Sequence, residues 1–118
     1  MNQTKRKHRV APPAGPDKWE VRCGNNDAGK GWDQLCQAEP ANTRWAWEQM
    51  SSEPAPSPPT TRHHRMKGSL STRTFEGRTL PQWQLEVTGA ARVWYLLDEE
   101  RSTVWIVHAG PSHPKSTE

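Results

Sequence analysis

The pattern of hydrophobic residues predicts an α+β domain, in which a small, mainly antiparallel sheet carries two N-terminal helices on one face. Three observations lead to this class. Residues 19–23 alternate between apolar and polar side chains, residues 27–50 repeat at three- and four-residue steps, and residues 83–107 return to strand patterns. The expected order is one strand, two helices and four further strands.

Composition sets the size of this domain. The chain has 118 residues, 31% hydrophobic side chains and a mean hydropathy of −1.04, which approaches the composition of disordered proteins. Seven tryptophans nevertheless stand outside the proline-rich stretches, and each buries roughly 150–250 Å². We therefore expect one domain over residues 18–118, preceded by a basic, proline-rich flexible tail at residues 1–17 that lies outside the core.

The first half of the domain is predicted to hold one strand and two helices. Residues 19–23 have the period of a half-buried strand, and Asp27 follows as the expected N-cap of a helix that ends before Pro40. Asn42 is the expected cap of the second helix, which lies antiparallel to the first. The apolar face of this second helix is predicted to consist of Thr43, Ala46, Trp47 and Met50.

The second half begins with a connector rich in proline and serine at residues 51–61. A short strand is predicted around residues 64–68, where the signal is weak. Alternation, or an enrichment in aromatic and branched side chains, predicts three further strands at residues 83–87, 92–97 and 104–107. The charged residues 98–102 are expected to form the hairpin loop between the last two strands.

The cysteines and the absence of long apolar segments indicate a compartment. Cys23 and Cys36 stand in a chain whose first 17 residues lack the apolar stretch of a secretory signal. Both thiols are therefore expected to be reduced and structural, with a disulfide or redox pair as the alternative. No run of about 18 apolar residues occurs, so we predict a cytoplasmic protein without membrane association.

Positive charge is concentrated in two segments. Residues 1–18 carry five lysines and arginines against one aspartate, and residues 62–92 carry six against two glutamates, so each has a net charge of +4 in a protein of net charge +3. Two basic segments on an otherwise acidic body favour a polyanionic partner, most simply nucleic acid. Solvated surface faces are the alternative.

Alternation along residues 83–87 predicts one polar face of the sheet. If Trp83 packs against the helices, Gln84 and Glu86 lie on the opposite face. The neighbouring strand brings Arg92 close to them. This combination suits contact with a phosphodiester, and an ordinary cross-strand ion pair between Glu86 and Arg92 is the alternative.

Histidines add acid–base chemistry near the same face, because the chain returns past His108 toward His113 and Lys115. His63 and His64 are expected at the surface. The histidines lack zinc-type spacing, and the sequence contains no glycine-rich phosphate loop, nucleophile elbow or Cys-x-x-Cys. No metal and no cofactor are expected.

Four segments together resemble the RelE/ParE superfamily of bacterial toxins. They are His63–Leu70, Gly77–Gly89, Ala91–Asp98 and the ending from Val107 through His113 to Lys115. The most specific piece is Arg92-Val93-Trp94-Tyr95, which leads into an acidic turn. The resemblance covers roughly residues 19–118, and its element order agrees with the one read from periodicity.

The resemblance implies a toxin of a type II toxin–antitoxin system, which is a monomer when free and a hetero-oligomer with its cognate antitoxin. In the RelE-like branch, it implies an endoribonuclease that cuts mRNA on the ribosome and so inhibits translation. The ribose 2′-hydroxyl attacks the adjacent phosphate without a metal. The alternatives are a ParE-like toxin that inhibits gyrase and a noncatalytic RNA- or protein-binding module on the same fold.

The resemblance also implies roles for individual residues. Arg92 matches the arginine that contacts the scissile phosphate, His113 the C-terminal general acid or base, and Lys115 a supporting cation. Glu86 stands where relatives carry lysine or a catalytic carboxylate, so it is either the base or structural. The expected RNA contacts are Arg65, Lys67, Arg73, Arg78, Trp83 and Gln84, with solvated positions as the alternative for Arg73 and Arg78 and a core position for Trp83.

Overall fold

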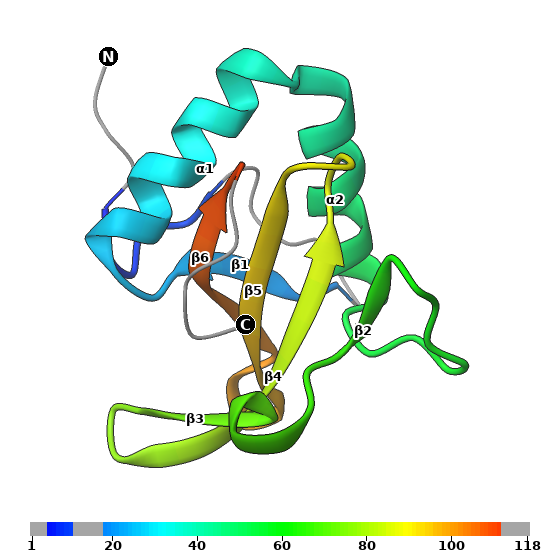
Figure 1. Ribbon diagram of the computed structural model, residues 1–118. Coiled ribbons are helices and arrows are strands. Elements are labelled where there is room, and N and C mark those ends of the chain that lie inside the picture. The colour runs from blue at the N-terminus through cyan, green and yellow to red at the C-terminus, as the bar shows by residue number, and fades with distance from the viewer. Residues whose placement is uncertain (1–4, 11–17, 112–118) are drawn as a thin grey trace.

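A computed structural model describes residues 5–10 and 18–111 (Figure 1). Two helices cover one face of a twisted sheet, and a long hairpin folds over the other. Along the chain, the elements are β1 (Glu20–Cys23), α1 (Asn26–Ala38), α2 (Pro40–Ser52), β2 (His63–Arg65), the 3-10 turn η1 (Gly68–Leu70), β3 (Thr72–Phe75), β4 (Arg78–Glu86), β5 (Arg92–Asp98), the 3-10 turn η2 (Glu99–Arg101) and β6 (Thr103–Gly110).

The sheet has the order β1-β6-β5-β4-β2, with β3 also paired to β4. The pairs from β2 to β6 are antiparallel, whereas β1 and β6 are parallel neighbours. The predicted α+β class and the mainly antiparallel sheet are therefore confirmed. The strand predicted around residues 64–68 is present as β2, but it begins one residue earlier and ends three residues earlier, at Arg65.

The helix caps differ from the prediction. Asn25 rather than Asp27 caps α1, because its side-chain oxygen accepts from the amide of Ala28 at 2.7 Å. The second helix begins at Pro40, whose missing N–H costs nothing in the first turn. Asn42 therefore lies inside α2 and donates instead to the carbonyl of Val87 at 3.0 Å, which ties the helix to the end of β4.

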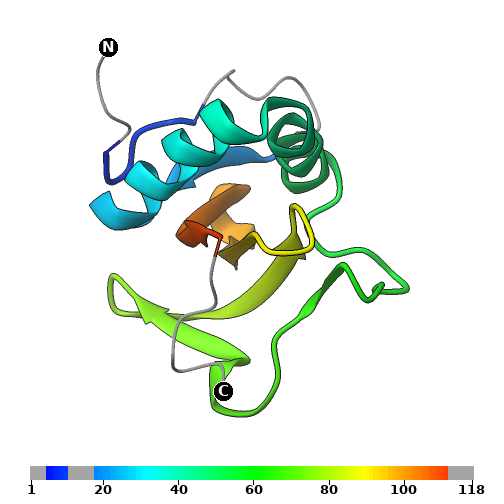
Figure 2. The same cartoon turned by 45° about the horizontal axis from the view of Figure 1, so that its top comes forward.

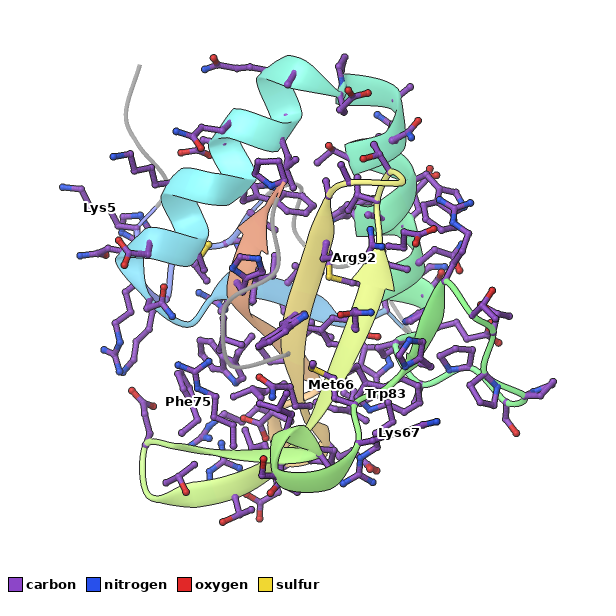
Figure 3. All side chains as sticks on the ribbon, in the orientation of Figure 1. Lys5, Met66, Lys67, Phe75, Trp83 and Arg92 are labelled. Atoms are coloured by element: carbon purple, nitrogen blue, oxygen red, sulfur yellow. The ribbon has the colours of Figure 1, made fainter. Side chains whose placement is uncertain are left out.

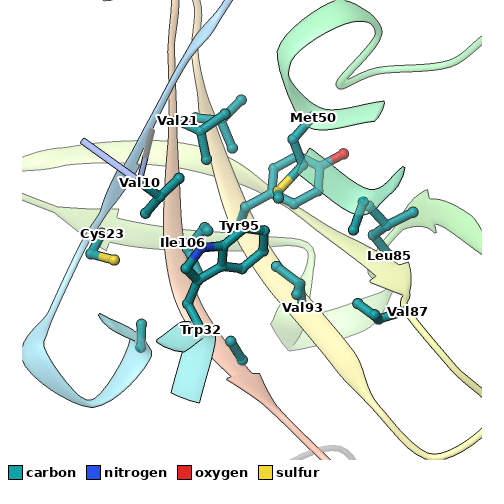
Figure 4. Packing of buried hydrophobic residues seen from close by; sticks show 14 of the residues in the cluster. Val10, Val21, Cys23, Trp32, Met50, Leu85, Val87, Val93, Tyr95 and Ile106 are labelled. Atoms are coloured by element: carbon teal, nitrogen blue, oxygen red, sulfur yellow. The ribbon is translucent and has the colours of Figure 1, made fainter. Parts of the chain in front are cut away.

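The larger apolar cluster lies between the helices and the sheet (Figure 4). Tyr95, Leu85 and Ile106 are fully buried there and face α1 and α2. On α2, the predicted apolar face is confirmed for its buried threonine, alanine and methionine, whereas Trp47 is half-buried. The helix α1 crosses β6 so closely that a Cβ at Gly31 would lie 1.8 Å from the Ala109 carbonyl oxygen.

A second apolar cluster on the opposite face was not predicted. The β3–β4 hairpin curls over β5 and β6 (Figure 2) and places Phe75 against Trp105, with ring centroids 4.9 Å apart. Its two-residue turn has positive φ at both Glu76 (50°) and Gly77 (80°), the geometry that twists correctly into a hairpin. Because only Phe75 of β3 is buried, the strand shows no alternation in the sequence.

Residues 5–10 do not lie outside the core, as had been expected for the whole of residues 1–17. Val10 is buried in the larger cluster, and its amide donates to the Val21 carbonyl of β1. Arg6 and Lys7 both form ion pairs with Glu76 at the turn of the β3–β4 hairpin. This short segment therefore covers the free edge of β1 and links it to the hairpin.

The expectation that His63 is a surface residue was wrong. Its side chain is 4% exposed, and Nε2 is hydrogen-bonded to the hydroxyl of Tyr95, which donates in turn to the Pro54 carbonyl. Desolvation, together with the neighbouring His64, lowers the pKa of His63 to about 4, although the Pro54 carbonyl acts in the opposite direction. The imidazole is therefore neutral at pH 7 and holds the connector against the sheet.

The two cysteines form no disulfide. Cys23 belongs to the core, and burial, reinforced by Asp33, raises the pKa of its thiol to about 12. Cys36 is exposed on α1. Neither α1 nor α2, the two α-helices of the described residues, is long and apolar enough to cross a membrane.

Candidate nucleic-acid interface

A row of polar and aromatic side chains crosses the sheet on the face opposite the helices. Gln84 of β4, Trp94 of β5 and His108 of β6 are register partners in adjacent strands. The indole Nε1 of Trp94 donates to Gln84 Oε1 at 2.9 Å, and the His108 ring packs edge-on against the Trp94 ring with centroids 5.5 Å apart. We call this row, together with Glu86 and Arg92, the outer-face cluster.

A β-bulge turns His108 toward this cluster. The register between β5 and β6 shifts between Trp94 and Tyr95, which leaves Val107 as the extra residue. Strict alternation would send Val107 and His108 to opposite faces, but both contact the outer face because the bulge breaks the alternation. Asn25 stabilises the irregular backbone, since its Nδ2 donates to the Val107 carbonyl at 3.2 Å.

The imidazole of His108 extends along the sheet toward the Glu86–Arg92 pair. A Cβ on Gly110 would lie 3.7 Å from Cε1 and 4.0 Å from Nε2 of His108. Gly110 is the register partner of Arg92, so the ring lies over the residue directly opposite this arginine. The structure thus brings a half-buried histidine to the side of the arginine and the carboxylate that sequence analysis placed on this face.

Arg92 is tightly held within the cluster. Its Nη2 lies 3.0 Å from Oε1 of Glu86, its register partner on β4. Its Nη1 donates to the carbonyls of Thr88, Gly89 and Ala91 in the β4–β5 turn, and the side chain is only 13% exposed. The cross-strand ion pair that sequence analysis gave as one reading is therefore present, and it also stabilises the hairpin turn.

Glu86 lies between two arginines. Besides Arg92, it faces Arg62, whose Nε is 3.6 Å from Oε2 and whose Nη2 donates to the Glu86 carbonyl at 3.2 Å. The Arg62 guanidinium also stacks on the ring of Trp45 from α2, at 4.4 Å from its centroid. Arg62 was not among the expected site residues, because its partners come from elements distant in the chain.

The expected RNA contacts on the second basic segment fall into two groups. Arg65, Lys67 and Arg73 are exposed at the β2–β3 edge, where Lys67 projects away from the sheet (Figure 3). Arg65 donates to the Ser71 carbonyl at 3.2 and 3.3 Å. A pocket of about 640 Å³ at this edge is lined in part by His64, Arg65 and Lys67. The side chains of Arg65, Lys67 and Arg73 are therefore accessible to a polyanion in the folded protein.

Arg78 and Trp83 belong to the fold rather than to the outer-face cluster. Arg78 donates to both carboxylate oxygens of Asp98 and to Glu100. Trp83 is 9% exposed and packs on the helix side, edge-on to His63. Alternation along β4 places this side chain on the helix side of the sheet, so it cannot stack on a base at the outer face.

His113 and Lys115, the expected C-terminal catalytic residues, lie outside the described residues. His108 is the functional candidate that sequence analysis did not select, although it noted the residue. Alternation along β6 could not assign its face, since a bulge depends on backbone pairing with β5.

Within residues 5–10 and 18–111, no group of three or more histidine, cysteine, aspartate or glutamate side chains could hold a metal ion. No family model, curated protein or solved structure matches this chain. The outer-face cluster and its surroundings are therefore the basis of the proposed function.

Proposed function

We propose that the protein is a RelE-like toxin of a type II toxin–antitoxin system, which cleaves messenger RNA on the ribosome without a metal. The observation that supports this most is the position of His108, whose ring packs on Trp94 and lies over Gly110, opposite Arg92. Exposed Arg65, together with neighbouring cations at the β2–β3 edge, supplies a route for the RNA backbone.

The chemistry needs two proton transfers and stabilisation of negative charge. The ribose 2′-oxygen forms a bond to phosphorus while its proton passes to a base, and the bond from phosphorus to the 5′-oxygen breaks as an acid protonates that oxygen. In this proposal, His108 performs one transfer, and His113 or Glu86 performs the other. Arg92, with Lys115, stabilises the charge that develops on the phosphoryl oxygens.

The test is cleavage of an mRNA by the purified full-length protein, with and without ribosomes, mapped by primer extension. The expected result is new 5′ ends that require ribosomes. His108→Ala should reduce the cleavage rate by about 100-fold or more, the usual contribution of a general acid or base. His8→Ala, a substitution of an exposed histidine in the N-terminal segment that pairs with β1, is the matched control and should cleave normally. Intact mRNA with folded protein would refute the proposal.

A noncatalytic RNA-binding module is the second candidate, and one observation favours it. The Arg92 guanidinium is already engaged by Glu86 and by three turn carbonyls, as in a structural arginine. That function predicts RNA binding with unchanged RNA. A ParE-like toxin would instead leave mRNA intact and induce DNA-damage signalling through gyrase.

The proposed antitoxin is a protein partner that covers the basic surface. The exposed cations Arg65, Lys67 and Arg73 favour an acidic segment of such a partner. Co-expression with the product of an adjacent reading frame should suppress growth inhibition and yield a stable hetero-oligomer.

A further inference from the structure

A second pocket lies between the C-terminal half of α2 and the segment that leads into β2. Figure 1 shows these two parts of the chain next to each other. Its volume is about 410 Å³, within the range of small-molecule sites. None of the roles considered so far uses it. The lining residues are Trp45, Gln49, Glu53, Pro56, Ser57, Pro58, Thr60, Arg62 and His63.

One wall of this pocket is built rigidly. His63 is 4% exposed and is fixed by the Tyr95 hydroxyl. Its backbone N–H and C=O both bond to Thr60, which closes the loop beside the pocket. The same Tyr95 hydroxyl holds the Pro54 carbonyl. A preformed wall lowers the entropic cost of binding a ligand.

The opposite wall is formed by α2 and the residue that caps its C-terminal end. Trp45 and Gln49 stand four residues apart on the helix, so their side chains lie one above the other, and the C-cap residue Glu53 continues the wall. This wall offers an aromatic side chain, an amide and a carboxylate. Aromatic rings and arginine guanidinium planes stack on nucleobases, and amide or carboxylate groups recognise their edges.

The polar groups of this wall match one base better than the others. A glutamine amide donates and a carboxylate accepts twice, whereas guanine offers an acceptor at O6 beside donors at N1 and N2. Adenine, cytosine and uracil have no two adjacent donors on this edge, so one oxygen of the carboxylate would face an acceptor. We propose that this pocket binds a guanine base of the RNA, with Glu53 accepting from N1–H and N2–H, Gln49 donating to O6, and the Arg62 guanidinium, which lies on Trp45, stacking on the base.

Arg62 connects this pocket to the outer-face cluster. Its guanidinium stacks on Trp45 and also faces Glu86, so the pocket and the Glu86–Arg92 pair lie within one side-chain length of each other. A guanine in the pocket therefore belongs to a nucleotide close to the phosphate at Arg92. The inference rests on the proposed function, to which it adds a base preference.

The test uses RNA that cannot be cleaved, so that it is independent of catalysis. Fluorescence anisotropy would compare labelled 2′-O-methyl hexanucleotides that carry one central guanine, adenine or inosine in an otherwise identical uridine strand. Wild-type protein should bind the guanine strand about tenfold more tightly than the adenine strand. Inosine, which lacks the N2 amino group, should fall between them.

Two variants of α2 complete the experiment. Glu53→Gln should abolish the preference for guanine and leave the adenine strand bound as before, whereas Glu48→Gln, on an exposed carboxylate outside the pocket lining, should keep the preference. Equal binding of the strands by wild-type protein, or a preference that survives in Glu53→Gln, would overturn the inference. If the preference is seen but mRNA is never cleaved on the ribosome, the guanine site stands and the ribonuclease proposal fails.

Discussion

Arg78 and Asp98 join the β3–β4 hairpin to the far end of β5. The arginine donates to both carboxylate oxygens of a fully buried aspartate, which also accepts from Trp105 Nε1 at 3.0 Å and from Arg101. Hydrogen bonds from Arg78, assisted by those of Trp105 and Arg101, hold the pKa of Asp98 well below its usual range, although burial opposes them. This carboxylate therefore links the β3–β4 hairpin to η2 and to β6.

The Asp98 carboxylate should stabilise the fold at neutral pH and lose this effect in acid. Because the pKa of Asp98 is lower in the folded protein, its contribution is complete above the unfolded value of 3.8 and disappears as the pH falls toward the folded value. Asp98→Asn should lower the melting temperature at pH 7 and flatten its fall in acid. Differential scanning calorimetry measures both, with Glu99→Gln, an exposed carboxylate, as control. Equal melting curves for the two variants would contradict this role.

The buried His63 should make stability depend on pH over a separate window. Burial lowers its folded pKa to about 4 from an unfolded value of 6.5, so the unfolded state binds the extra proton between these values. The stabilisation that depends on neutral His63 is complete above pH 6.5. As the pH decreases from 6.5 to 4, the free energy of unfolding falls by up to about 1.4 kcal/mol per pH unit.

His63→Gln removes this titration, so its free energy of unfolding should change less with pH in that window. Urea titrations at several pH values measure the slope. The other charged groups near His63 are His64, Arg62 and Glu53, and His64→Gln is the control for the neighbouring imidazole. An unchanged slope in His63→Gln would show that another group carries it.

The contact between α1 and β6 should tolerate no side chain at Gly31. A Cβ there would meet the Ala109 carbonyl at 1.8 Å, and backbone cannot move aside as a flexible side chain can. Gly31→Ala should cost about 3 kcal/mol, near the upper end for overpacked cores. Gly89→Ala, where a Cβ meets nothing within 4 Å, should be close to neutral. Chemical denaturation compares the two, and similar stabilities would mean that the helix is not seated as described.

The β3–β4 hairpin should contribute to stability through the second apolar cluster. Phe75 is 8% exposed and packs on Trp105, so Phe75→Ala should cost about 3–5 kcal/mol. Thr74→Ala, on the exposed side of the same strand, should cost little. Hydrogen exchange of the β3–β4 pairing provides a second measurement. Retained protection in the phenylalanine variant would show that the hairpin is held elsewhere.

The exposed cations should determine the salt dependence of RNA binding. Lys67→Ala should weaken binding at low salt and reduce the slope of log affinity against log salt by about 0.7, the release expected for one single-strand phosphate contact. Lys30→Ala, an exposed substitution on α1, is the control. Binding measured from low to moderate salt separates them. A slope that falls equally in both variants would remove RNA from the β2–β3 edge.

Sequence patterns predicted the elements that bury one regular face. The strand at residues 20–23, both helices, the second half of β4, and the strands β5 and β6 follow from strand or helix patterns, because burial against a partner layer imposes those patterns. The same parity correctly placed Gln84 and Glu86 opposite the helices. A cross-strand ion pair between Glu86 and Arg92 was one of the two alternatives that this placement left open, and the structure contains it.

Other features depend on contacts between distant parts of the chain. The bulge beside Val107 needs β5 and the cap Asn25, the burial of His63 needs Tyr95, and Arg62 acquires its role only from Trp45 and Glu86. None of these leaves a local period in the sequence.

Local patterns were enough to predict an α+β domain with a basic second half and a polar sheet face, because periodicity and charge are local properties of the chain. Which basic side chains are available could be seen only once the chain was folded. Arg78 is paired with Asp98, and Arg92 with Glu86 and its turn, whereas Lys67 stays exposed. Ion pairs depend on distances across the sheet, which spacing along the chain does not encode.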